Sequence, residues 1–398
     1  MRVYHFSEEP YPDAWSPDRE SLRITIPNEL CDPEVAHKLY HRYIDEWMLA
    51  DKLGMDIMIN EHHSTATCLT ASANLILAIL ARVTKRARLL VLGVPIANRP
   101  DPVRIAEEMA MIDVISGGRL EFGMIKGVPY EMAPANSNAT TLMDRFWEAH
   151  DLILKAMSTH DGPFNFEGKY FHARQVNIWP RPLQQPHPPV WSSTATPSNA
   201  KELARRGYIM SSFMGGTVET VKLHRAYLEG WKEAGRGDTV PVDRLAYMGM
   251  CAIADNEADS RKRANNIADY LRTNAQVAEP FNKPPGYFAP EAAFRSMRSA
   301  NPKAFRTLYT PGGRPVELAT ATLEDFIECG IVFTGTPDQA YEQICDFIDT
   351  IGGLGHLILM GQGGHMQHDE VVDSLTLFGK NVLPRLKERY SGARAFAA

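Results

Sequence analysis

Short apolar runs alternate along the whole sequence with longer segments of helical periodicity, and this alternation limits the fold more than any other feature. The runs have the length and β-branched content of strands that are buried on both faces, and helical segments follow them. Eight runs are expected to be strands: 1–6, 56–60, 88–93, 120–124, 188–193, 208–212, 245–254 and 356–360. Such alternation predicts a parallel α/β sheet, and eight units in one chain predict a single (β/α) eight-stranded, TIM-like barrel.

The helical segments carry ordinary start and stop residues. Asp32-Pro33 opens the first one in the N-cap and N1 positions, and Gly54 ends it. A doubly wound open sheet is the alternative fold, but no G-x-G-x-x-G follows the first strand. The other expected helices are 70–83, 101–115, 141–157, 197–206, 218–234, 257–274, 337–351 and 368–386.

Two segments interrupt the alternation. Residues 161–182 are polar and aromatic, as in a hairpin packed outside the main body, and residues 276–325 are rich in Pro, Gly and Arg. We read 276–325 as an insertion over one face of a single domain that spans residues 1–398. The loop from Ser7 to Asp32 is too long for a plain connection and is expected to contribute to a site.

Charge and cysteine usage exclude several classes of protein. The formal net charge is −6, which does not favour binding to nucleic acid or to an anionic membrane surface. No apolar run is long enough to cross a bilayer, and the first residues read as a strand without a signal peptide. The five cysteines never form a Cys-x-x-Cys pair, which predicts reduced thiols in a cytoplasmic protein.

The strand at 56–60 runs into Asn60-Glu61-His62-His63. The C-terminal ends of the strands are where a parallel barrel keeps its chemistry, so these residues are candidate catalytic groups. The plainer alternative is that one histidine caps the strand end while the other faces solvent.

Two other strand ends have the composition of anion sites. The stretch from Ser193 to Ser198 is rich in hydroxyl groups and enters a helix at a proline, and free N–H groups at a helix N-terminus suit a phosphate. Lys126, next to Gly127, can place a cation where the backbone approaches closely. For the 193–198 stretch, simple helix N-capping is the alternative.

A metal site is not expected. On an extended strand His62 and His63 point to opposite sides, so they cannot both bind one ion without a bend. His365 and His368 have helical spacing, but no carboxylate partner is evident in the sequence.

The longer motifs resemble those of the bacterial luciferase-like flavin monooxygenases. The resemblance covers nearly the whole chain in order and is least specific at 276–325. It rests on Glu61-His62-His63, on the 101–108 segment, on Asp113 with Ser116-Gly117-Gly118-Arg119, on 166–171, on the Pro-rich 180–189 block, and on the ending 336–384.

This resemblance implies a barrel that uses reduced FMN and dioxygen to oxidise a small organic substrate, with a separate flavin reductase as partner. It implies an acid–base or hydrogen-bonding role for His62, which Glu61 would orient, and a homodimer built on 70–83 and 101–115. It also implies a non-proline cis peptide between Gly93 and Val94. The residues assigned to flavin binding are Val94, Lys126, Val128, Thr140, Ser193, Thr194, Ala195, Thr196 and Ser198.

Two departures from the luciferase pattern concern the phosphate. The luciferase arginine becomes Lys126, which keeps the charge but loses the bidentate fork. A second phosphate arginine falls on Thr140, so Lys126 and Arg145 are left to balance the phosphate. The luciferase thiol falls on Ile125, and no thiol role is transferred to this chain.

The substrate is expected to be largely apolar, because aromatic residues lie in the two long loops (Trp15, Phe281, Tyr287, Phe288). Two other functions remain open for this barrel. One is a deazaflavin-dependent dehydrogenase, which transfers hydride without oxygen, and the other is a non-catalytic flavin-binding subunit.

Overall fold

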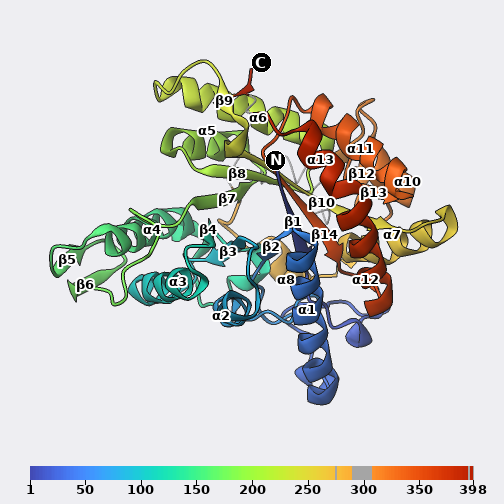
Figure 1. The fold of residues 1–398 in the computed structure, drawn as a ribbon. Coiled ribbons are helices and arrows are strands. Elements are labelled where there is room, and N and C mark those ends of the chain that lie inside the picture. The colour runs from blue at the N-terminus through green and yellow to red at the C-terminus, as the bar shows by residue number, and fades with distance from the viewer. Residues whose placement is uncertain (274–275, 289–306, 393–394, 398) are drawn as a thin grey trace.

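Eight parallel strands close into a barrel in the computed structural model, which describes residues 1–273, 276–288, 307–392 and 395–397. Hydrogen bonding runs in the order β10-β14-β1-β2-β3-β4-β7-β8, and pairing of β10 with β8 closes the ring (Figure 1). The TIM-like fold class is thereby confirmed. The eight strands are β1 (Arg2–Ser7), β2 (Asp56–Ile59), β3 (Leu89–Pro95), β4 (Leu120–Ile125), β7 (Val190–Thr194), β8 (Ile209–Phe213), β10 (Leu245–Ile253) and β14 (His356–Gln362).

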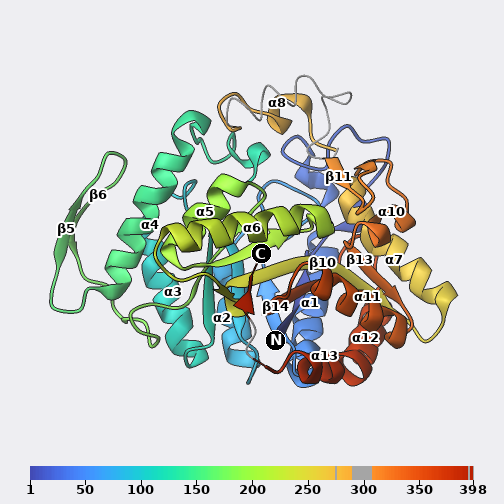
Figure 2. The same cartoon turned by 90° about the horizontal axis from the view of Figure 1, so that it is seen from above.

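Helices surround the barrel and begin or end within a few residues of the predicted positions (Figure 2). The predicted cap of the first helix is present: the Asp32 carboxylate accepts a hydrogen bond from the Glu34 N–H at 2.8 Å, and Gly54 ends the helix at φ 84°. The predicted closing helix is interrupted by a π-helical turn at Phe378–Val382. The helices are α1 (Pro33–Leu53), α2 (Ala73–Val83), α3 (Pro102–Ser116), α4 (Leu142–Ser158), α5 (Pro197–Arg206), α6 (Gly216–Glu233), α7 (Glu257–Arg272), α11 (Pro337–Thr350), α12 (His368–Leu377) and α13 (Leu383–Arg389).

One strand of the main sheet was not predicted from the sequence. Strand β13 (Val332–Gly335) follows the short helix α10 (Leu323–Glu328) and pairs in parallel with the last residues of β10, from Met250 to Ile253. Its residues form a short apolar run between Gly330 and Gly335, which is the pattern of a buried strand. The run lies a few residues after the 276–325 segment, which interrupts the alternation of strands and helices in the sequence.

The two interrupting segments have different outcomes. Strands β5 (Phe164–Glu167) and β6 (His172–Val176) form the predicted hairpin, which projects from the body beside α4 (Figures 1 and 2). Within 276–325, the structure describes α8 (Glu279–Asn282) and an antiparallel pair, β11 (Thr307–Tyr309) with β12 (Pro315–Glu317). Residues 289–306 of the predicted insertion lie outside the described residues.

Side chains fill the interior of the barrel. Tyr4 on β1 and Trp191 on β7 are fully buried and meet edge to face with ring centroids 5.8 Å apart. These strands are not neighbours in the sheet, so their contact crosses the interior. The barrel is therefore a packed core, which leaves the loops at the strand ends to form a site.

Candidate active site

The end of β2 places His62 at the mouth of the barrel. Ile57, Met58 and Ile59 are fully buried, and the chain leaves the sheet at Asn60, whose amide Nδ2 donates to Glu8 Oε2 at 2.9 Å. The imidazole of His62 then lies between groups from two segments, the loop after β1 and the turn after β4, and its side chain is 13% exposed. This small exposure leaves the ring accessible from the mouth while most of it is held by protein.

A carboxylate fixes one ring nitrogen of His62. Nδ1 lies 2.9 Å from Glu131 Oε1 and 3.3 Å from the Tyr130 hydroxyl. A carboxylate only accepts hydrogen bonds, so Nδ1 carries the proton and donates it to Glu131. Glu131 and Tyr130 belong to the 3₁₀ turn Pro129–Glu131, which follows β4.

The second ring nitrogen, Nε2, faces another carboxyl group, with Glu8 Oε1 at 3.8 Å. Burial alone would lower the pKa of His62, but the hydrogen bond and charge of Glu131, with the charge of Glu8, outweigh it and raise that pKa. His62 therefore holds a proton more tightly than an ordinary histidine does.

Glu61 does not orient His62, so that prediction is wrong. The buried carboxylate of Glu61 lies 3.2 Å from Nε2 of His63, accepts from the guanidinium of Arg99, and accepts from the Ala73 N–H at 3.0 Å. Strand alternation explains the difference, because it turns His62 and His63 to opposite sides. Glu61 therefore links the β2 end to the start of α2, and Glu131 orients His62.

Sequence reasoning missed Glu8, Glu9 and Glu131. Glu8 and Glu9 follow β1 directly and are 0% and 1% exposed. The length of the Ser7–Asp32 loop was the available signal, and it identified the segment without identifying the residues. Arg23, from the same loop, is also buried and donates to the Thr273 carbonyl oxygen at 2.7 Å.

The predicted cis peptide is displaced by one residue. The non-proline cis bond lies between Leu92 and Gly93, not between Gly93 and Val94. A Cβ on Gly93 would sit 2.7 Å from the carbonyl oxygen of Gly123, so β3 and β4 approach too closely here for a side chain. Val94, a predicted flavin contact, is fully buried directly after this point.

Lys126 directly follows β4, which pairs with β7, the strand that leads into the 193–198 stretch. Register places it level with Thr194, because Gly123 pairs with Trp191 on the adjacent strand β7. Its Nζ is 3.8 Å from the centre of the Tyr287 ring and 3.5 Å from the Tyr287 carbonyl oxygen. Burial lowers the pKa of Lys126. A cation in this environment would gain from an anionic partner.

Two further flavin candidates, Val128 and Thr140, lie in the segment between β4 and α4. Val128 is half-buried just before the Pro129–Glu131 turn, and Thr140 is exposed in a second 3₁₀ turn (Ala139–Thr141). Gly286 packs against Thr140, where an added Cβ would meet the threonine methyl group at 2.5 Å. Thr140 therefore lies under the 276–288 segment, which also carries Tyr287.

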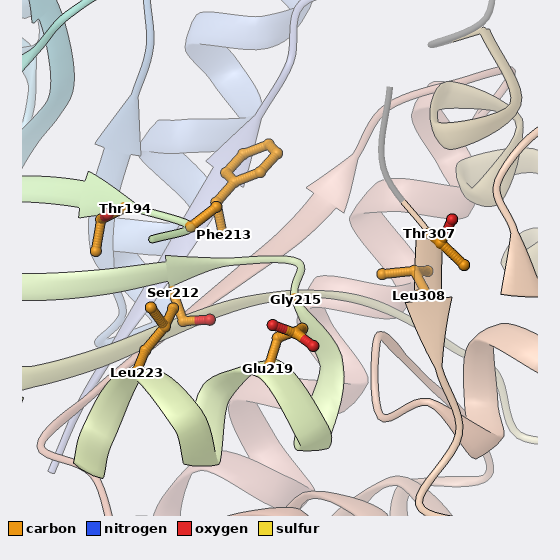
Figure 3. Close-up of a pocket in the computed structure, with 9 residues that line it drawn as sticks. Thr194, Ser212, Phe213, Gly215, Glu219, Leu223, Thr307 and Leu308 are labelled. Carbon is orange, nitrogen blue, oxygen red and sulfur yellow. The ribbon is translucent and has the colours of Figure 1, made fainter. Parts of the chain in front are cut away.

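The 193–198 stretch borders a small cavity of about 110 Å³, enough for several water-sized groups. Figure 3 shows Thr194 and Phe213 at adjacent strand ends, with Glu219 on α6 facing the β11 residues Thr307 and Leu308. Thr194 is buried, Ser193 is half-buried, and Ala195, Thr196 and Ser198 are exposed. The lining residues are Thr194, Ala195, Ser212, Phe213, Gly215, Glu219, Leu223, Thr307 and Leu308.

The donor set at these strand ends fits a phosphate ester. Helix α5 begins with Thr196 as N-cap, and among the described residues the Thr196 side chain makes no capping hydrogen bond to the first N–H groups. Free N–H groups at a helix start, the hydroxyl groups beside them and a nearby ammonium are the usual elements of phosphate binding. Among the described residues that line the cavity, Glu219 carries the one opposing charge, and Lys222 neutralises it through a contact of 2.6 Å. Flavin mononucleotide is therefore compatible with the residues present.

Two further features bear on the class of protein. Among the described residues, no group of three His, Cys, Asp or Glu side chains could hold a metal ion. Within the same ranges, no helix is long and apolar enough to span a bilayer.

The fold and the site together define a parallel barrel enzyme whose mouth carries a carboxylate-bound histidine. The chain belongs to the luciferase-like monooxygenase family, whose sequence model matches residues 26–353. This assignment supports the resemblance noted from the motifs and implies a flavin.

Named relatives are similar over most of the chain. The flavin-dependent trigonelline monooxygenase oxygenase component of Acinetobacter baylyi is 29% identical over 247 residues, 59% of this chain and 65% of that protein. The alkanal monooxygenase alpha chain of Aliivibrio fischeri is 24% identical over 371 residues, 89% of this chain and 96% of that one. Alignments with the first curated relatives span about half to two thirds of their length.

Solved structures show the same fold. The oxygenating constituent of 3,6-diketocamphane monooxygenase from Pseudomonas putida, in complex with FMN, superposes with a TM-score of 0.70 at 21% identity, covering 97% of this chain and 98% of that one. The monooxygenase RslO1 from Streptomyces bottropensis gives a TM-score of 0.71 at 20% identity, with coverage of 97% and 100%.

Proposed function

We propose that this chain is the oxygenase component of a two-component flavin monooxygenase. It would use reduced FMN from a separate reductase, together with dioxygen, to transfer one oxygen atom to an organic substrate, while the second oxygen atom leaves as water. The observation that carries the proposal is the His62 imidazole, held at Nδ1 by Glu131 at the barrel mouth of a luciferase-like chain. The five free cysteines fit the expected cytoplasmic setting.

Each group of the site has a task in this proposal. Lys126, the hydroxyl groups of 193–198 and the first N–H groups of α5 would bind the phosphate of FMN, and Val94 and Val128 would border the flavin. When bound, reduced FMN supplies the electrons that activate dioxygen. His62 holds a proton at Nε2, Glu131 keeps the ring from rotating, and the protein around the ring limits the access of water.

The proposal is tested by supplying the purified chain with FMN, a flavin reductase, NADH and oxygen, and by screening organic compounds for products heavier by one oxygen atom. His62→Ala should bind reduced flavin and consume oxygen but form about 100- to 10,000-fold less product, as expected for loss of a positioned acid–base group. His63→Ala is the matched control, since His63 contacts Glu61, and it should retain coupling. Equal coupling in wild type and His62→Ala would show that the histidine is only structural.

A deazaflavin-dependent dehydrogenase is the second candidate, because one relative is the F420-dependent glucose-6-phosphate dehydrogenase of Amycolatopsis mediterranei, 25% identical over 347 residues. Anaerobic reduction of a deazaflavin, without reaction in the FMN and oxygen assay, would select this function. If neither reaction occurs but the chain raises the activity of a partner protein, it is a non-catalytic subunit.

We also propose a homodimer through α2 and α3. Large apolar side chains are exposed on these two helices, which pack side by side. Leu75 is 68% exposed on α2, and Ile115 is 49% exposed on α3. Clustered apolar surface of this kind marks protein interfaces. The other members of the cluster are Ile79, Met111 and Val114.

A further inference from the structure

Two consecutive carboxyl groups at the end of β1 are buried in the wall of the barrel mouth. Glu8 is fully buried, and its Oε2 accepts from the amide Nδ2 of Asn60 at 2.9 Å. Its other oxygen, Oε1, lies 3.8 Å from Nε2 of His62. Glu8 thus approaches the one nitrogen of His62 that Glu131 does not hold.

Glu9 differs from Glu8 although it is equally buried. Its side chain hydrogen-bonds the Thr70 hydroxyl, and its φ of 51° is unusual for a residue other than glycine. Burial raises the pKa of Glu9 well above the ordinary value, and the charge of Glu8 adds to the effect. Glu9 therefore holds its proton more tightly than an ordinary carboxyl group does, and no described contact joins it to the His62 ring.

We propose that Glu8 and His62 exchange a proton across the buried side of the barrel mouth, and that a protonated Glu8 returns its proton to Nε2 when the imidazole has given one up. In this step the bond between Glu8 Oε1 and hydrogen breaks while an N–H bond forms at Nε2. Glu8 becomes a carboxylate, the imidazole becomes cationic, and the charge of the pair does not change. Glu8 is a positioning residue here, because it acts through His62.

The surroundings of Glu8 permit both protonation states. Burial raises the pKa of Glu8 to about 7, although His62, Tyr270, Arg23 and Asn60 each oppose that rise. When two neighbouring ionisable groups interact, their protons leave in two steps that belong to the pair and not to either residue alone. The titratable and charged groups facing Glu8 are His62 at the end of β2, Glu9, Arg23 and Cys68 from the loops, Tyr130 after β4, and Tyr270 on α7.

The use of this proton in turnover rests on the proposed monooxygenase function. The exchange of the proton between Glu8 and His62 does not depend on that function. The test is an NMR pH titration of His62 in the flavin-free protein with isotope-labelled histidine. The chain has thirteen histidines, so the His62 resonance is assigned by its loss in His62→Gln. We expect two titration steps in the wild type and one step in Glu8→Gln, with the proton bound about tenfold or more weakly in the variant.

Glu9→Gln is the matched control, because it alters the neighbouring buried carboxyl group and should keep both steps. If Glu8→Gln does not fold, carboxyl carbon shifts of labelled glutamate give the reciprocal measurement: the Glu8 midpoint should move by the same factor in His62→Gln. A His62 midpoint that is equal in wild type and Glu8→Gln, or a Glu8 midpoint that is indifferent to His62, would overturn the proposal. Failure to form an oxygenated product would contradict the proposed function and leave this result unaffected.

Discussion

Replacing Glu131 by glutamine isolates the charge that holds His62. In the wild type, His62 Nδ1 lies 2.9 Å and the backbone nitrogen of His63 lies 3.1 Å from Glu131 Oε1. Glutamine keeps an acceptor oxygen for both groups but removes the negative charge. The side chains of Glu131 and His62 are 2% and 13% exposed, so solvent screens the pair weakly. A hydrogen bond to a charged group contributes about 1.5–3 kcal/mol, and one pKa unit is about 1.36 kcal/mol. The pKa of His62 should therefore fall by about one to two units.

The same change predicts how stability depends on pH. The pKa of His62 is raised in the folded protein, so the bound proton stabilises the fold fully below the unfolded-state pKa of about 6.5. That contribution is lost as pH rises through the higher folded-state value. The wild type should therefore be more stable than Glu131→Gln by about 1.5–3 kcal/mol near pH 6, and the difference should shrink toward pH 9.

The assay combines denaturant unfolding at several pH values with an NMR titration of the His62 ring. Tyr130→Phe is the control, because it removes the hydroxyl that lies 3.3 Å from Nδ1 and keeps the Glu131 charge; it should produce a much smaller shift. A stability difference between wild type and Glu131→Gln that stays constant from pH 6 to pH 9 would refute the reasoning. So would an unchanged midpoint for His62.

Two other predictions concern the flavin edge and the surface. Lys126→Glu should weaken binding of reduced FMN several-fold or more, because a half-buried carboxylate would oppose the phosphate. An unchanged affinity in a flavin titration would show that Lys126 is not part of the flavin site. In light scattering at micromolar concentration the wild type should have the mass of a dimer, and Leu75→Asp should shift it toward the monomer because it places a charge in the exposed apolar cluster. A monomeric wild type would contradict the dimer.

The barrel could be predicted because its evidence is local and repeated. A few consecutive apolar residues predict each of the eight barrel strands, and capping residues such as Asp32 and Gly54 mark helix ends. Strand β13 was not predicted, because its short apolar run follows a segment without helical or strand periodicity. The cis peptide was assigned one bond too late, since the sequence shows that a glycine is needed there but not which of its two peptide bonds is cis.

The residues around His62 were harder to predict, and for different reasons. Glu131 lies 69 positions from His62 and belongs to a 3₁₀ turn whose direction no periodic pattern fixes. Lys126, five positions before Glu131, was identified because a glycine follows it at a strand end and because a phosphate arginine of the luciferase pattern falls on it. The prediction that Glu61 orients His62 assumed that adjacent residues act together, whereas strand alternation separates them and gives Glu61 to His63.

Glu8, by contrast, follows from the barrel once its strand order is accepted. In a TIM-like barrel the first two strands are parallel neighbours, and here Phe6 pairs with Met58. Extending that register by two residues sets Glu8 beside Asn60, and the two side chains do hydrogen-bond at 2.9 Å. The same register brings a carboxyl group to the strand end that carries His62. A buried acid next to a candidate acid–base histidine is thus a consequence of strand pairing, and register is the information that motif reading leaves unused.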